Sequence, residues 1–305
     1  MVSPRDGCVG LIALAACRVQ RRLNMLPNTL ISADQAIALQ RGGVAIVVLD
    51  ARFDLADVDA GLRDWCAGHL PKSIYLHLDR DLSGAKTGRN GRHPLPERAT
   101  FARTLGNCGV TPQTPVIALD AQGGMYAARV WWMLRWMGHT DMAVLDGGVA
   151  AWLRAGGALD ARAAAPTAAP AYPDRLPLVP TETADRLAKA LGCVRLVDAR
   201  APERFRGDVE PLDRQAGHIP GALNRFFKEN LAENGCFKPA EQLRGEFMPL
   251  LAGQGAEWVV HQCGSGVTAC HNLLAMEYAG LTGSSLYPGS WSEWSADPQR
   301  PVARG

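Results

Sequence analysis

The sequence predicts an α/β protein built from two tandem, related domains, each a parallel sheet flanked by helices. Three observations support this prediction: an internal repeat, short apolar or β-branched runs that alternate with helical patterns, and glycine-containing loops that join a run to the next helix. The repeat includes Asp-Ala-Arg ending at Arg52 and at Arg200, and a Gly-His motif with proline beginning at Gly68 and at Gly217. Two copies of one pattern indicate two copies of one fold.

The later part of the repeat is free of gaps. Residues 127–152 match residues 269–294 at a constant separation of 142 positions. Just before them, the apolar runs 116–120 and 258–262 each lead through a loop into a helical pattern. Ligands of parallel α/β sheets bind beyond the carboxyl ends of the strands. The segment after residue 262 is therefore the expected location of a site.

Local signals support the individual elements and divide the chain. Ser32 to Gln35 has the pattern of a capping box, which predicts a helix that begins there. We assign residues 1–26 to an N-terminal extension, 27–156 to a first domain, 157–180 to an Ala/Pro-rich linker and 181–305 to a second domain. Five prolines from Pro166 to Pro180 are typical of a semi-rigid linker rather than of a packed element.

The N-terminal extension needs its own interpretation. Its apolar residues 7–16 precede Cys17 and could pass for a lipoprotein signal. However, Arg5 is offset by Asp6, and further arginines follow the apolar segment directly. We therefore interpret residues 1–24 as an extension or an over-long gene start, with the first domain beginning near Met25.

Composition narrows the class of protein. The 305 residues are 47% hydrophobic and 20% charged, which is typical of a soluble globular protein with two ordinary domains. A net charge of +2 gives no reason to expect a nucleic-acid or membrane partner, and no apolar stretch reaches the roughly 18 residues of a membrane span. Eight scattered cysteines without a CxxC pair indicate free thiols in a reducing compartment. We expect a cytoplasmic protein.

The loop around Cys263 is the strongest candidate for a reactive site. It follows a predicted strand, precedes a predicted helix, and contains Gly264 and Gly266, which let the backbone turn several N–H groups inward. A helix N-terminus adds positive potential, so the loop favours an anion such as a thiolate or a persulfide. An inert structural cysteine is the alternative, but it leaves the two glycines and the helix start without a purpose.

A metal site is the other interpretation of this region. His261, Cys263, Cys270 and His271 carry metal-binding side chains, but Cys263 and Cys270 lack the short spacing of structural zinc ligands. We expect no metal, and we interpret Cys270 as a packing residue one turn into the helix.

Three motifs together carry a family resemblance that covers nearly everything from Met25 onward. They are the Gly-His-Ile-Pro-Gly-Ala segment at Gly217, the closing run 287–294 (Tyr-Pro-Gly-Ser-Trp-Ser-Glu-Trp), and Cys263 in a six-residue loop. The chain resembles the tandem-domain sulfurtransferases of the rhodanese family. The resemblance implies a catalytic second domain and a first domain that lacks the cysteine, with Ala121 at the equivalent position.

The loop sequence also bears on the sulfur donor. Cys-Gly-Ser-Gly-Val-Thr is similar to the family members that use 3-mercaptopyruvate, whereas members that prefer thiosulfate carry Arg-Lys after the cysteine. Two cations would suit a dianion, and Gly264 and Ser265 supply no charge. The resemblance therefore implies transfer of sulfur from 3-mercaptopyruvate through a Cys263 persulfide, with release of pyruvate and without a cofactor. Cyanide, a small thiol or a thioredoxin-like protein is the implied acceptor, and thiosulfate is the alternative donor.

The resemblance also implies binding residues. Backbone N–H groups of Gly264, Gly266, Val267 and Thr268 would bind the sulfur anion. A planar guanidinium suits a carboxylate, and Arg204 is the implied ligand for the donor. Arg214 is a second candidate, although it lies closer to the Gly-His-Ile-Pro motif than expected. A solvated surface charge is the alternative for both arginines.

A proton relay is implied as well. Ser265 would hydrogen-bond the donor or the thiol, and His69 would act through Ser265 with Asp59 as its acidic partner. Asp57 and Asp64 are alternatives to Asp59, and a buried histidine bonded to backbone is the alternative for His69. We assign no chemistry to His93, whose segment is expected to line the cleft. We expect Asp198 and Arg200 to form a structural pair behind the site.

Two other function classes fit the pattern less well. Dual-specificity phosphatases share this fold and use a cysteine loop, but they need an arginine after it. Thr268 or Ala269 stands there, and the loop is one residue short. A non-catalytic binding module would not need the intact Cys263 loop.

Overall fold

The computed structural model describes residues 25–163 and 165–305. The expectations for residues 1–24 lie outside the described residues. The first half forms a parallel sheet of order β1-β5-β4-β2-β3, and the second half forms a parallel sheet of order β7-β6-β8-β9. The predicted α/β fold with two related sheets is confirmed. The strands are β1 (Leu30–Ile31), β2 (Val47–Asp50), β3 (Ile74–Tyr75), β4 (Val116–Leu119), β5 (Met142–Leu145), β6 (Arg195–Asp198), β7 (Leu223–Asn224), β8 (Val259–Gln262) and β9 (Ser285–Leu286).

Helices cover both faces of the first sheet. Val116 and Ala118 of β4 belong to a core that includes α3 and α4, while Ile117 and Leu119 belong to a second core with α1 and α5. The predicted capping box is present at the start of α1. The helices of this half are α1 (Ala33–Arg41), α2 (Ala60–Ala67), α3 (Arg98–Asn107), α4 (Ala127–Trp136) and α5 (Gly148–Arg154).

The second half repeats this plan. Its helix α9 begins at Ala269 and α4 begins at Ala127, so the sequence repeat places both helices directly after the loop at the end of a central strand. Thr181 forms a parallel bridge with Leu286, much as β1 pairs with β5 in the first half. The helical segments of this half are α6 (Ala184–Ala190), α7 (Pro202–Arg206), η1 (Phe227–Asn230), α8 (Ala240–Leu251), η2 (Ala256–Trp258), α9 (Ala269–Tyr278) and α10 (Ser290–Trp294).

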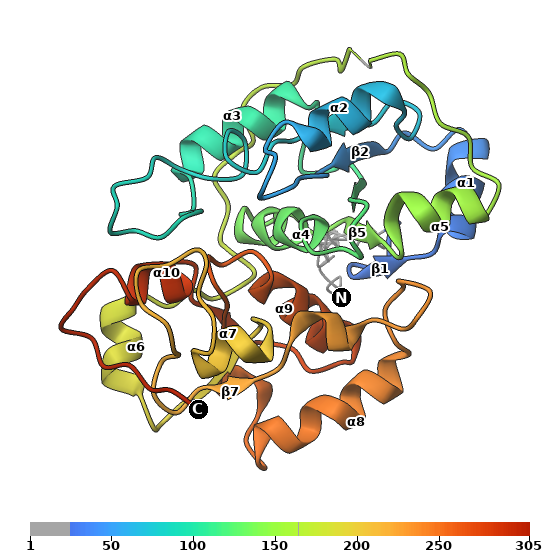
Figure 1. Cartoon of the computed structure of the whole chain (residues 1–305). Helices are drawn as coiled ribbons and strands as arrows, with labels where there is room; N and C mark the ends of the chain where they lie inside the picture. Colours follow the sequence, from blue (N-terminus) through green and yellow to red (C-terminus); the bar gives the residue numbers. More distant parts are fainter. Residues whose placement is uncertain (1–24, 164) are drawn as a thin grey trace, which may run out of the picture.

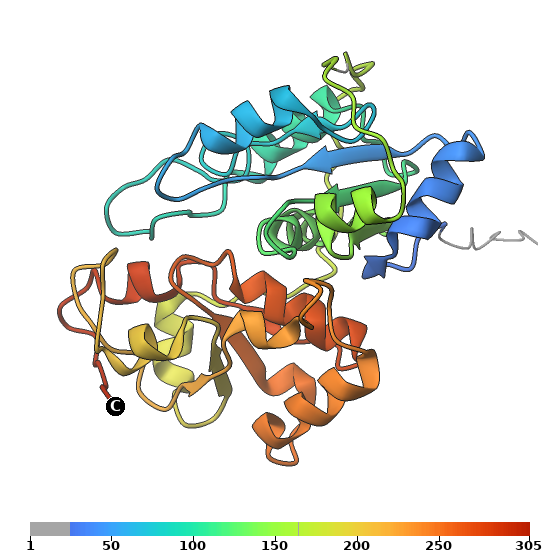
Figure 2. The same ribbon diagram turned by 45° about the vertical axis from the view of Figure 1, so that its right-hand side comes forward.

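The two halves pack against each other through α4 and α9. Figure 1 shows these helices facing one another at the boundary, and Figure 2 shows the halves one above the other. One core cluster contains buried residues of both halves, and Arg135 on α4 forms a 3.4 Å ion pair with Glu277 on α9. Loops from one half can therefore complete a site in the other.

The Ala/Pro-rich segment is more closely packed than predicted. It runs over the first half before entering α6 (yellow-green in Figure 1). The N–H of Tyr172 donates to the carbonyl of Ala102 at 2.9 Å. The N–H of Leu178 donates to the carbonyl of Arg135 at 3.0 Å. Tyr172 and Val179 are buried. The expectation of an unpacked linker is therefore wrong for this part of the segment.

No helix within residues 25–163 and 165–305 is long and apolar enough to cross a membrane.

Candidate active site

Cys263 lies at the carboxyl end of the central strand β8, where the topology predicts a site. Its side chain is buried, with 2% of the residue exposed. It lies in a cavity of about 320 Å³ whose lining comes from both halves of the molecule. The first half contributes Leu55, Leu78, Arg92, His93, Met125 and Tyr126 to this lining.

The backbone of Cys263 is fixed by the motif around α10. The N–H of Cys263 donates to Ser290 Oγ at 3.1 Å, and the Cys263 carbonyl accepts from the N–H of Trp291 at 3.0 Å. Ser290 has a φ of +53°, a left-handed conformation that is strained for serine. Its counterpart Gly148 has the same φ. Serine is held there in spite of the strain, and its hydroxyl accepts the hydrogen bond that positions the nucleophile.

The loop after Cys263 has a tight backbone turn and amides without a hydrogen-bond acceptor in the described part of the chain. Gly266 has a φ of +75°, and a Cβ there would lie 2.3 Å from the carbonyl oxygen of Pro288, so only glycine fits. No acceptor within the described residues takes the N–H groups from Gly264 to Thr268. These amides are available to an anion bound to, or formed on, Cys263.

The first half contains an equivalent loop, and that loop binds a carboxylate of the chain itself. The register of β2 with β4 and of β6 with β8 makes Asp120, not Ala121, the counterpart of Cys263. The expectation for Ala121 is therefore wrong, because the first loop is one residue longer. The Asp120 carboxylate accepts four backbone N–H groups at 2.8–3.0 Å, from Gln122, Gly124, Tyr126 and Ala127.

A histidine from the first half contacts the loop. His93 Nδ1 lies 2.8 Å from Ser265 Oγ, and His93 Nε2 lies 3.7 Å from Asp79 Oδ1. Burial lowers the pKa of His93 to about 3, an effect that the Asp79 carboxylate only partly offsets. His93 is therefore neutral near pH 7, so that one ring nitrogen can accept a proton from Ser265 or return it. The sequence signal for this role was weak, because His93 carries no motif of its own.

Two guanidinium groups lie beside Gly264. A Cβ at Gly264 would lie 2.7 Å from Nη2 of Arg92 and 3.5 Å from Nη1 of Arg204. Arg204 forms an ion pair of 2.6 Å with Glu210, and both arginines contact Asp213. Gly264 and Ser265 supply no charge, as the sequence indicates, but the region beside them is charged. The cations are supplied by other elements, and acidic side chains balance them.

Comparisons with known proteins fit this geometry. The family model described as a rhodanese-like domain matches residues 32–155 and again 183–297. The chain belongs to the rhodanese family. It is 44% identical to a Pseudomonas aeruginosa protein named as a probable 3-mercaptopyruvate sulfurtransferase, over 89% of this chain and 96% of that relative. It is 38% identical to a Mycobacterium tuberculosis protein provisionally named as a thiosulfate sulfurtransferase, over 91% and 98%. The solved structure of a 3-mercaptopyruvate sulfurtransferase from Leishmania major matches with a TM-score of 0.80 and 27% identity, covering 92% of this chain and 78% of that one.

His69 of this rhodanese-family chain lies in a different place from the one expected. It is fully buried, stacks on Trp65 with ring centroids 4.0 Å apart, and contacts the carbonyls of Trp65 and Arg162 at 2.7 and 3.2 Å. Its counterpart His218 stacks on Phe205 in the same way. The predicted contact of His69 with Ser265 is wrong, because the histidine of this motif anchors the fold in both halves.

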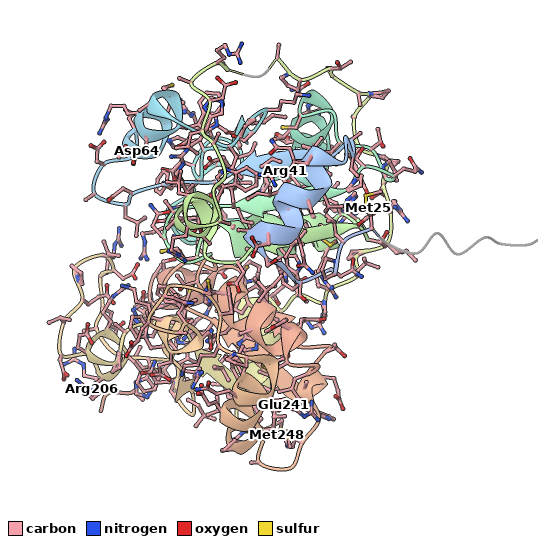
Figure 3. All side chains as sticks on the ribbon, turned by 90° about the vertical axis from the view of Figure 1, so that its right-hand side faces the viewer. Met25, Arg41, Asp64, Arg206, Glu241 and Met248 are labelled. Carbon is pink, nitrogen blue, oxygen red and sulfur yellow. The ribbon has the colours of Figure 1, made fainter. Side chains whose placement is uncertain are left out.

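The acidic partners expected for His69 are surface residues. Asp59 stands at the start of α2 without a side-chain cap hydrogen bond, and Asp57 pairs with Arg63 at the surface. Figure 3 shows Asp64 on α2, away from the second half. Asp79 is the carboxylate that lies near the histidine of the site.

Arg214 also lies apart from the cavity of Cys263. It lines a neighbouring cavity with Lys86 and Ser292, whereas Arg204 lines the cavity of the nucleophile. The expectation for Arg214 as a second ligand in that cavity is wrong, and Arg92 occupies the place beside Arg204 instead.

Asp198 and Arg200 form the structural pair that was expected. Arg200 Nη2 lies 2.7 Å from Asp198 Oδ2, donates to the carbonyl of Gly217, and stacks over Trp291. Asp50 and Arg52 repeat this arrangement in the first half. Among the described residues, no group of three or more His, Cys, Asp or Glu side chains could hold a metal ion.

Proposed function

We propose that the chain transfers sulfur from 3-mercaptopyruvate to a thiol or cyanide through a persulfide on Cys263, with release of pyruvate. The observation that supports this most is the set of unpaired loop amides around Cys263, because the equivalent amides bind the Asp120 carboxylate in the first half. A loop of this kind stabilises negative charge at the sulfur before and after transfer.

The first proposed step forms the persulfide and releases pyruvate. The Cys263 thiolate attacks the thiol sulfur of the donor, the carbon–sulfur bond breaks, and its electron pair goes to the methylene carbon. That carbon takes a proton to give pyruvate, and the proton of the donor thiol balances this uptake, so a persulfide anion remains on Cys263. Ser265 and neutral His93 lie 2.8 Å apart and form the relay that we propose for the proton.

The charges around Gly264 favour a monoanionic donor. Arg92 and Arg204 place two guanidinium groups where both can donate hydrogen bonds to one carboxylate, and a planar guanidinium matches the geometry of a carboxylate. Glu210 and Asp213 bond to these arginines and leave little excess positive charge. Because these carboxylates already neutralise part of the charge on Arg92 and Arg204, a dianion such as thiosulfate gains less there than it would beside two unpaired cations.

A donor comparison tests this proposal. Turnover with mercaptopyruvate and with thiosulfate is measured at equal concentrations, with cyanide as acceptor, and we expect a preference for mercaptopyruvate. Arg204→Gln and Arg92→Gln should each lower kcat/KM for mercaptopyruvate. The expected loss of transition-state stabilisation is about 1.5–3 kcal/mol, the range for a charged hydrogen bond. Arg214→Gln is the matched control and should have little effect. Preference of the unmodified enzyme for thiosulfate would overturn the assignment of the donor.

The covalent intermediate has its own test. Incubation with donor alone should add the mass of one sulfur atom to the peptide that contains Cys263. Cys263→Ser should abolish both the added mass and the turnover. Sulfur found mainly on Cys270 would contradict the proposal.

The acceptor follows from the chemistry of the outer sulfur. A thiolate or cyanide attacks the outer sulfur of the persulfide and regenerates the Cys263 thiolate, in a two-step exchange. The six cysteines within the described residues are free, as in a reducing compartment. We propose a cytoplasmic enzyme with a small thiol or a thioredoxin-like protein as its acceptor.

A further inference from the structure

We propose that Arg129, which the first half contributes, is the buried positive charge that pairs with the anionic sulfur of Cys263. The inference rests on the proposed function for the nature of that anion. Arg129 is a positioning residue, because it acts on the sulfur through the loop and through its electric field.

Arg129 is buried without a carboxylate. It lies on α4 with none of its surface exposed, and no salt bridge among the described residues includes it. The other deeply buried arginines of the repeat, Arg52 and Arg200, each have an aspartate two residues away as a partner. A buried unpaired charge costs several kcal/mol unless something compensates for it. Arg129 therefore requires a source of negative charge elsewhere.

The contacts of Arg129 lead to the cysteine loop. Its Nη1 donates to the carbonyl of Gly266 at 3.0 Å, and its Nη2 donates to the carbonyls of His93 and Leu82 at 3.2 and 3.4 Å. The thiol of Cys270 donates to the same Gly266 carbonyl at 3.4 Å. One guanidinium thus bonds both to the loop that carries the nucleophile and to the segment that carries His93.

Of the two nearby thiols, Cys263 is the one that can supply the charge. Burial lowers the pKa of Arg129, and negative charge on Cys270 or Cys263 acts in the opposite direction. Burial raises the pKa of Cys270 to about 12, so that thiol stays neutral near pH 7. The sulfur of Cys263, as thiolate or persulfide, is the remaining anion.

The other charges around Cys263 differ from Arg129 in position and pairing. They line the open cavity, and three of the arginines already contact carboxylates. Arg129 is fully buried and is not part of the cavity lining, and an unscreened charge has a larger effect in such a region of low dielectric constant. Besides Cys263, the charged or titratable groups on the cavity side are Arg92, His93, Tyr126, Arg200, Arg204 and Lys228.

The first test measures reactivity without turnover. The rate at which neutral iodoacetamide alkylates Cys263 at pH 7 is followed by peptide mapping in the full chain. Arg129→Met should slow it about tenfold or more, because the neutral side chain no longer stabilises negative charge on the sulfur, whereas Arg129→Lys, which keeps the charge, should stay within about threefold of the unmodified enzyme. Arg135→Met, on the same helix, removes an ion pair with Glu277 and should leave the rate unchanged.

Two outcomes of this test would overturn the proposal. One is a folded Arg129→Met enzyme that is alkylated at the normal rate. The other is equal slowing in Arg129→Met and Arg129→Lys, because charge would then not be the property that matters. Folding of each variant is checked by circular dichroism.

A second test remains valid if Arg129→Met does not fold. Cys263→Asp places in this loop the carboxylate that Asp120 provides in the first loop, and Cys263→Ser places a neutral group there. The thermal midpoint of Cys263→Asp should exceed that of Cys263→Ser by several degrees with arginine or lysine at position 129, and by clearly less in Arg129→Gln, where only the loop amides remain to bind the carboxylate. A difference that is the same in Arg129→Gln as in Arg129→Lys would refute the pairing. Because neither test needs a donor, its failure is distinguishable from failure of the proposed sulfur transfer.

Discussion

Asp120 and Cys263 occupy the same place at the ends of equivalent strands. The N–H of Ala51 donates to the carbonyl just before Asp120 at 2.8 Å, and the N–H of Ala199 donates to the carbonyl just before Cys263 at 2.9 Å. After this point the two loops differ in their anion. The first half has a carboxylate bonded to four amides, and the second half has a sulfur with free amides around it.

Removal of the Asp120 carboxylate should destabilise the first half. Asp120→Ala leaves four amides without their acceptor, and the cost should reach about 3 kcal/mol or more of unfolding free energy, given roughly 1–3 kcal/mol for each buried group left unpaired. Urea unfolding followed by tryptophan fluorescence measures it. Asp59→Ala, a surface change without a lost cap hydrogen bond, is the control and should stay within about 0.5 kcal/mol. A loss below about 1 kcal/mol for Asp120→Ala would contradict this account.

Substitution of His93 should affect catalysis, whereas substitution of His69 should affect stability. His93→Asn removes the partner of Ser265 and should reduce the rate of persulfide formation about a hundredfold, the usual contribution of a positioned acid or base. His69→Asn removes a buried ring from its stack on Trp65 and should lower the thermal midpoint, while the rate per folded molecule stays near normal. Stopped-flow release of pyruvate gives the rate. A catalytic loss confined to His69→Asn would restore the assignment that the structure contradicts.

The contribution of Ser290 to turnover should come from the hydrogen bond of its hydroxyl group and not from its backbone conformation. Ser290→Ala keeps the strained φ and loses the acceptor for the Cys263 amide, so both stability and turnover should fall. Ser290→Gly relieves the strain and loses the same hydrogen bond, so it should be more stable than Ser290→Ala by about 1 kcal/mol with a similar loss of turnover. Equal activity of Ser290→Gly and the unmodified enzyme would show that the hydrogen bond does not position the nucleophile.

Acid should destabilise the protein through its buried histidines. Burial lowers the pKa of His93 and His261 to about 3 and that of His271 to about 4. Between the ordinary histidine pKa and these values the unfolded chain binds protons that the folded chain does not, so the unfolding free energy falls as the pH drops from about 6.5 toward 4. Each histidine should contribute roughly 2 kcal/mol of this loss by pH 5.

The variant His261→Leu isolates one of these contributions. His261 is fully buried, so the variant should show a weaker pH dependence of urea unfolding between pH 6.5 and 4.5, by about one proton. Comparison with the unmodified chain cancels the common contribution of the carboxylates. An unchanged slope would mean that His261 does not titrate in this window.

The sequence predicted local features of the site well. Cys263, its glycines and its helix lie within one short segment, and the repeat places that segment at the end of a strand, so the local pattern predicts the loop. Arg204 was predicted from the family resemblance instead. The contact between His93 and Ser265 spans 172 residues and forms only when the halves pack, so no spacing could reveal it. The role of His69 was an expectation from the family resemblance. The presence of the same motif at His218 was the signal that it belongs to the fold.

Loop length and charge pairing were harder to predict. A difference of one residue between the two loops made Ala121 look like the counterpart of Cys263, and only the strand register identifies Asp120. Likewise, Arg92 comes from the first half, and its position beside Gly264 depends on the packing of the halves.

The Asp120 carboxylate belongs to the chain itself, so the first loop has its anion in every state of the protein. The second loop gains an anion only while Cys263 is ionised or carries sulfur. Because a group that forms favourable contacts only in the folded state raises its stability, the resistance of the second half to unfolding should rise and fall with sulfur supply. The lifetime of the protein in the presence of proteases would then depend on whether Cys263 carries sulfur.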